Sequence, residues 1–279
     1  MFTLGQFLAC LVVPAVLVLI TAPLRRDLGP GWWTGGLAGA LLALAAALGH
    51  FAAAQTIGDA VAPPVRGWHW FIPGALALGV VTLVPAGRWR GVLLGGAACL
   101  AVAGVLQPLG GMSLALMGTW AVGAAVAVFL AGWAGERTLA AEGPKIGHGL
   151  LLLVAAGSAA VIGLGGSKDL ALLSATVASA LGGSAILAVM GWSSARGLAL
   201  PVTALLSGHL AIGAGYAETS PVAAGLVTLA LPLAALGNRW TGTRGSVIRV
   251  AVAVVLVATA VVVAARQGLA DPGYGGYGG

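Results

Sequence analysis

The chain has 279 residues, of which 59% are hydrophobic and only 7% are charged, and its mean hydropathy is +1.04. A water-soluble globule of this size cannot bury so much apolar surface, so the composition excludes an ordinary soluble domain and places the chain in a lipid bilayer. The net charge of +6 does not indicate a nucleic-acid partner, because the basic residues stand one to three at a time between apolar runs and form no accessible patch.

The apolar runs are continuous over about 17 to 23 residues, the length of a membrane-spanning helix and about twice that of a barrel strand. The sequence therefore predicts an all-α fold, a polytopic transmembrane helix bundle of about ten spans. Spans three and four are the weakest, and they also fit a re-entrant hairpin followed by one helix. The predicted spans cover residues 4–22, 32–54, 70–85, 91–106, 112–133, 146–164, 170–192, 198–215, 221–236 and 247–265.

Lysine and arginine divide unevenly between the two sides of such a bundle. Three of them, Arg66, Lys168 and Arg266, fall on one side, and ten fall on the other. Because cytoplasmic connections carry the excess of basic residues, the richer side is predicted to be cytoplasmic, which leaves both termini outside the cytoplasm of a multi-pass cell-membrane protein. The ten are Arg25, Arg26, Arg88, Arg90, Arg137, Lys145, Arg196, Arg239, Arg244 and Arg249.

The most charged segment, residues 135–145, is expected to be a cytoplasmic loop that divides one transmembrane domain, residues 1–272, into halves 1–135 and 146–272. Two successive halves of five spans each have opposite orientations, as in many secondary transporters, although no residue-level similarity relates these halves. Such transporters bind substrate where helices are broken by Gly or Pro, and Gly182-Gly183 and Pro232 are candidate interruptions. The glycine-rich tail, residues 273–279, is expected to be flexible.

Glycine is abundant, with 46 residues, and much of it lies inside the predicted spans. Small residues let transmembrane helices approach closely, so we expect helix contacts at the Gly35/Gly39 and Gly91/Gly95 pairs and around Gly182-Gly183.

Two polar stretches share one spacing, because His50 precedes Asp59 by nine residues and His209 precedes Glu218 by nine. The predicted topology puts both stretches on the outer side, with each histidine one to two helical turns inside its span. A neutral histidine bonded to a neighbouring helix is the simplest interpretation. The alternatives are a solute or proton site built from these four residues, if spans two and eight are neighbours, and ligation of a haem or metal ion.

Catalytic motifs are absent: the sequence has no HExxH, no GxSxG, no Walker loop and no CxxC. Ser193 and Ser207 have no obvious base partner in the sequence, and no acid is predicted near the bilayer midplane, which disfavours an ion-coupled pump and an enzyme. The leading hypothesis is a permease for a small, weakly polar solute. A non-catalytic subunit that binds partner membrane chains or a second copy, and a haem or metal protein using His50 and His209, remain open.

Overall fold

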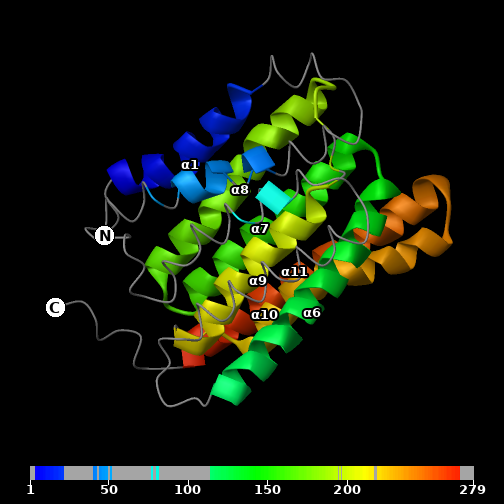
Figure 1. Ribbon diagram of the computed structural model, residues 1–279. Coiled ribbons are helices and arrows are strands. Elements are labelled where there is room, and N and C mark those ends of the chain that lie inside the picture. Colours follow the sequence, from blue (N-terminus) through cyan, green and yellow to red (C-terminus); the bar gives the residue numbers. More distant parts are fainter. Residues whose placement is uncertain are drawn as a thin grey trace.

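In the part of the chain that it describes, the computed structural model has seven α-helices and one 3-10 helix with defined bounds, together with a shorter helix at Ala40–Gly49, and no strand occurs there (Figure 1). The described residues are 4–21, 40–42, 44–49, 51, 77, 80–81, 114–193, 195, 197–216 and 219–270. The helices are α1 (Leu4–Leu19), α6 (Leu114–Ala140), α7 (Pro144–Leu164), α8 (Lys168–Val189), α9 (Ala199–Tyr216), α10 (Pro221–Ala234), η3 (Ala235–Arg239) and α11 (Gly242–Ala270).

Four helical segments are long and apolar enough to cross a membrane, namely Pro144–Leu164, Leu170–Val189, Pro221–Arg239 and Gly242–Gly268. α9 is also apolar over Ala199–Ala214 but shorter. Each predicted span after residue 145 therefore coincides with a helix. In the first half, α1 and α6 match the first and fifth predicted spans, and an apolar helix at Ala40–Gly49 lies in the second.

Several other predictions fall outside the described residues. The fourth predicted span and most of the third lie there, as do the Gly35/Gly39 and Gly91/Gly95 pairs and the tail 273–279.

Local chemistry explains where the helices begin. α7 starts with Pro144, whose missing N–H costs nothing in the first turn. α8 and α10 are capped by serines: the Ser167 hydroxyl accepts a hydrogen bond from the Leu170 N–H, and the Ser220 hydroxyl accepts one from the Ala223 N–H, both at 3.3 Å. These side chains satisfy helix N–H groups that have no partner inside the helix.

The loop expected at residues 135–145 is much shorter in the structure. α6 continues through Glu136 and Arg137 to Ala140, and only residues 141–143 separate it from α7. Charged residues mark where a helix leaves the apolar region, but Glu, Arg, Leu and Ala favour helix, so the helix ends only near Gly143 and Pro144.

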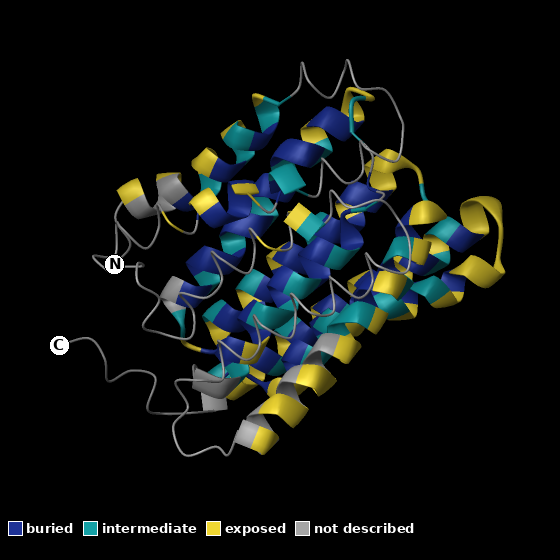
Figure 2. Ribbon diagram, viewed as in Figure 1, coloured by how far each residue is buried: buried dark blue, intermediate teal, exposed yellow. Residues whose placement is uncertain are grey.

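α7 is the central helix, because it packs against α8, α9, α10 and α11. α1 packs on α8 at one side of the bundle, and α6 packs on α9 and α10 at the other (Figure 1). Buried residues gather on the inner faces of these helices, and the outer faces carry exposed aliphatic residues (Figure 2). Such residues on α1, α6, α10 and α11 include Val12, Val16, Val122, Val126, Leu229, Leu233, Val254 and Val255. An apolar outer face is what a bilayer-embedded bundle requires.

Gly182-Gly183 does not interrupt its helix, contrary to the expectation, because α8 is continuous from Lys168 to Val189. The predicted close helix contact does occur at Gly183. A Cβ atom at this position would lie 2.7 Å from the carbonyl oxygen of Ala15 and 3.1 Å from its Cα atom. The backbones of α1 and α8 thus meet where only glycine fits. Gly182 has open space beside it, with nothing within 4 Å.

The Gly183 contact gives a stability prediction. Gly183→Ala forces α1 away from α8 and should lower the unfolding free energy by about 1–3 kcal/mol, as overpacking does in other tightly packed interiors. Gly182→Ala is the matched control and should be neutral or slightly stabilising, since alanine favours helix. Thermal unfolding of the two purified variants in mild detergent measures the difference. Equal melting temperatures would show that α1 does not depend on this contact.

Candidate functional site

The structure describes one of the four residues predicted to form a ligand site. His209 lies in α9 with 2% of its surface exposed. His50, Asp59 and Glu218 lie outside the described residues, so the predicted convergence of these four residues stays a prediction. Within the described part of the chain, no group of three or more His, Cys, Asp or Glu side chains is arranged to hold a metal ion.

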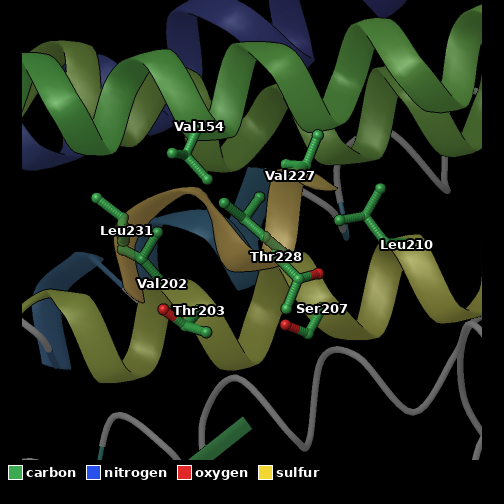
Figure 3. Close-up of a pocket in the computed structure, with 9 residues that line it drawn as sticks. Val154, Val202, Thr203, Ser207, Leu210, Val227, Thr228 and Leu231 are labelled. Atoms are coloured by element: carbon green, nitrogen blue, oxygen red, sulfur yellow. The ribbon is translucent and has the colours of Figure 1, made fainter. Parts of the chain in front are cut away.

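A small hollow lies where α7, α9 and α10 meet (Figure 3). Its position along the helices is central: Val154 is the middle residue of α7, Ser207 lies halfway along α9, and Thr228 lies near the middle of the Pro221–Arg239 segment. The hollow therefore lies at mid-length of two segments of membrane-spanning length and of the shorter apolar helix α9. Its lining residues are Val154, Val202, Thr203, Leu206, Ser207, Leu210, Val227, Thr228 and Leu231.

Three hydroxyl side chains give this hollow its polarity. Figure 3 shows Thr203 and Ser207 on α9 and Thr228 on the neighbouring α10. The Thr228 hydroxyl is engaged with its own helix, because it donates to the carbonyl oxygen of Ala224 at 2.9 Å. The Ser207 hydroxyl oxygen is buried and has no hydrogen-bond partner among the described residues. The cavity measures about 10 Å³, close to the smallest space that holds one water molecule.

Beside the hollow, the backbone changes from the α-helix α10 to the 3-10 helix η3. Pro232 lies inside α10, and because proline has no N–H, the carbonyl of Thr228 receives no hydrogen bond from the residue four positions later. Beyond it the Ala235 N–H bonds to the Pro232 carbonyl, and the chain continues as the 3-10 helix η3. The carbonyl of Leu231 then accepts a hydrogen bond from the Thr138 hydroxyl of α6 at 3.1 Å. Pro232, a predicted interruption, thus coincides with a real change of helix type.

A second polar cluster, at the end of the bundle where α7 begins, was missed by sequence reasoning. His148 is fully buried; its Nδ1 lies 2.8 Å from the carbonyl oxygen of Pro144, and its Nε2 lies 3.0 Å from Ser184 Oγ and 3.3 Å from Ser193 Oγ. A carbonyl only accepts, so Nδ1 carries the proton in the neutral ring and Nε2 accepts from a serine hydroxyl. Ser193 therefore does have a histidine partner, contrary to the expectation.

The sequence signal for this cluster was weak. Pro144 and His148 are four residues apart, which matches one helical turn, but Ser193 lies 45 residues further along the chain. The arrangement ties α7 to α8 and to the turn that follows α8. A hydroxyl bonded to a histidine resembles the pairing of a nucleophile with a base, yet His148 is 0% exposed, and a substrate could not reach the ring without moving the helices.

The same end of the bundle holds a buried ion pair. Glu142 Oε1 accepts from Arg249 Nε at 2.5 Å, and the two side chains are only 1% and 3% exposed. Arg249 also donates to the Gly237 carbonyl at 3.2 Å and to Asn238 Oδ1 at 3.1 Å, and Ser246 donates to Glu142 Oε2 at 2.9 Å. These bonds join the α6–α7 turn to η3 and α11, with the partners that buried charges require.

The Glu136 side chain caps the beginning of α9. Its carboxylate accepts hydrogen bonds from the backbone N–H groups of Gly197 and Ala199, both at 2.9 Å. A negative charge at a helix N-terminus is stabilised by the unpaired N–H groups and the helix dipole. Both acids whose side chains the structure describes, Glu136 and Glu142, are thus used to fix helix ends.

The helix ends that carry these acids also carry most of the described basic residues. Arg137, Lys145, Arg239, Arg244 and Arg249 lie at this end, where the Arg137 carbonyl accepts from Asn238 Nδ2 at 3.3 Å and the Arg137 guanidinium lies 3.7 Å from the centre of the Trp133 ring. This is the end that the charge pattern predicts to be cytoplasmic. We call it the basic end.

Comparison with protein-family models, with curated proteins and with solved structures gave no match to this chain.

The ion pair at the basic end generates a second stability prediction. Arg249→Met leaves the Glu142 carboxylate buried without its partner and should lower the unfolding free energy by about 3–5 kcal/mol. In the double variant Glu142→Gln/Arg249→Met no uncompensated charge remains, so it should be more stable than the single variant. Chemical denaturation in detergent measures both. A double variant as unstable as the sum of its two single changes would contradict a coupled buried pair.

Proposed function

We propose that the protein is a multi-pass membrane permease for a small, uncharged, weakly polar solute. The observation that carries the proposal is the hydroxyl-lined hollow at mid-length of α7, α9 and α10. The Ser207 hydroxyl in this hollow makes no hydrogen bond within the described bundle, so it is available to a ligand. Membrane transporters bind their substrates near the bilayer midplane, at helices whose regular hydrogen bonding is broken, and Pro232 supplies such a break beside this hollow.

The shape of the hollow indicates how transport would proceed. At about 10 Å³ it is closed to any solute larger than water. Passage of a larger solute therefore requires α9 or α10 to move. The Glu142–Arg249 pair and the Glu136 cap hold the basic end together, and in this proposal they keep that end closed.

A non-catalytic membrane subunit is the second candidate, and α6 supports it. Gly118, Thr119 and Gly123 are exposed on the outer face of α6, and the two glycines have no described atom within 4 Å of an added Cβ. Small residues on an outer face suit the close approach of another helix.

Purification in mild detergent separates the candidates. A stoichiometric partner chain supports the subunit, and a Soret band supports haem ligation at His50 and His209. An isolated monomer or homo-oligomer supports the permease.

Transport itself is testable without knowing the natural solute. Proteoliposomes containing the wild-type protein should respond to an osmotic step in urea or glycerol faster than empty liposomes, measured by stopped-flow light scattering. Ser207→Leu fills the hollow with an apolar side chain and should return the rate to that of empty liposomes. Thr119→Leu, the same enlargement of a hydroxyl residue on the outer face of α6, is the matched control and should behave as wild type.

Two further measurements make this test decisive. The melting temperature of Ser207→Leu shows whether the variant is folded, and Ser207→Ala, which adds no volume, keeps the test valid if the larger side chain is not tolerated. Wild-type protein that leaves urea, glycerol and water permeability at the level of empty liposomes would contradict the permease.

The orientation in the membrane is part of the proposal. The basic end is cytoplasmic, both termini are external, and the halves 1–135 and 146–272 are inverted relative to each other. In cysteine-free protein, a single cysteine at Glu218 should react with an impermeant maleimide added to intact cells. A cysteine at Thr243, which is exposed at the start of α11, should react only after the cells are opened. The reverse pattern would invert the topology.

A further inference from the structure

The lining of the hollow defines the charge of whatever binds there. Among the described residues that line it none is charged, and three of them, Thr203, Ser207 and Thr228, carry hydroxyls. A cation or anion moved to the centre of a membrane protein needs an opposite charge or a full set of strong ligands. With the described acids fixed at the basic end, the hollow favours a neutral ligand.

The Ser207 hydroxyl needs an acceptor that the described residues do not provide. A serine hydroxyl has one proton to donate and two lone pairs, and the buried Ser207 Oγ has no hydrogen-bond partner in the described part of the chain. Buried polar groups normally have partners. The hollow beside Ser207 has room for one group of the size of a water molecule.

On the facing helix α10, two backbone carbonyls lack the N–H donor that an α-helix normally supplies. One of them has a replacement donor. The Leu231 carbonyl, which the switch to η3 deprives of the Ala235 N–H, accepts from the Thr138 hydroxyl instead. The Thr228 carbonyl loses its partner to Pro232. A helical carbonyl points toward the residues three and four positions later, so this oxygen lies between Thr228 and Leu231, both of which line the hollow. The hollow is thus bordered by Ser207, whose hydroxyl has no partner among the described residues, and by Thr228, whose carbonyl lacks its usual helical donor.

We propose that the hollow binds one neutral hydrogen-bonding group the size of a water molecule, which accepts from the Ser207 hydroxyl and donates to the Thr228 carbonyl. The group is water itself or the hydroxyl or amino end of a small solute. This inference rests on the proposed permease function, because it names the chemical class that the permease recognises. The described lining offers a cation no charged partner, so the proposal names a neutral ligand.

Pro232→Ala is the sharpest test, because it separates recognition from stability. Alanine restores the N–H that bonds to the Thr228 carbonyl, so α10 should be as stable as before or more stable. The osmotic permeability of proteoliposomes should nevertheless fall about two- to tenfold, the factor that corresponds to one lost hydrogen bond. Pro14→Ala, the same change inside α1, is the matched control and should leave permeability unchanged. Unchanged permeability in Pro232→Ala would overturn the site.

A spectroscopic readout tests the site independently of transport. In a Ser207→Cys variant, with Cys10 and Cys99 replaced by alanine, the infrared S–H stretch should be shifted to the lower frequency of a bonded thiol, and adding Pro232→Ala should return it to the free position. A bonded thiol in buffer alone identifies the ligand as water, and one that appears only with glycerol identifies a solute hydroxyl. A thiol that is free under both conditions overturns the proposal. If the thiol is bonded but the proteoliposomes are no more permeable than empty liposomes, the binding site is supported and the permease function is contradicted.

Discussion

Hydrocarbon offers no hydrogen bond to a buried polar group, and the helix ends and the break in α10 show how this bundle meets that constraint. The helices satisfy their own backbones, and the serine caps of α8 and α10 satisfy the first N–H groups. Where the side chain of Pro232 breaks this pattern, the neighbouring carbonyl of Leu231 is bonded by Thr138 from α6. A break in one helix is therefore stabilised by a side chain from another, which links the local backbone to the arrangement of the bundle.

The same constraint separates charged from neutral polar groups along the length of the helices. The Glu142–Arg249 pair and the Glu136 cap lie at the basic end, close to the ends of their helices, where each charge has several hydrogen-bond partners. At mid-length the described polar side chains around the hollow are hydroxyls. Breaking the ion pair exposes a charge to an apolar environment, whereas changing a hydroxyl alters one hydrogen bond. The basic end therefore contributes mainly to stability, and the centre is free to contribute to binding.

Close packing through glycine decides how far the helices can move. Gly183 brings α8 against the backbone of α1, and Gly157 brings α7 against Val257 of α11. These contacts hold α1, α7, α8 and α11 as a tightly packed group. α9 and α10 instead meet across the hollow, with a change of helix type at Ala235. The hollow thus lies at a helix contact that these two glycine contacts do not include.

Much of this architecture could be predicted from the sequence, because hydropathy and capping act along a single helix. The all-helical class, the five helices after residue 145 and the gathering of basic residues at one end all follow from local patterns. The length of the α6–α7 connection was overestimated, since charge was taken as a sign of a loop where Glu136 and Arg137 continue the helix. Gly182-Gly183 was likewise expected to interrupt a helix that it does not interrupt.

Only the tertiary structure decided which polar residues meet. It brings Ser193 to His148 across 45 residues and Arg249 to Glu142 across 107, and it places Ser207 opposite Thr228 at the hollow (Figure 3). Of the predicted ligand residues, it buries His209 in α9, whereas His50, Asp59 and Glu218 lie outside the described residues. An apolar pattern specifies that a helix is buried in the bilayer. In a chain so rich in alanine and glycine, many helix faces are nearly alike, so the pairing of faces depends on the shapes of side chains far apart in sequence.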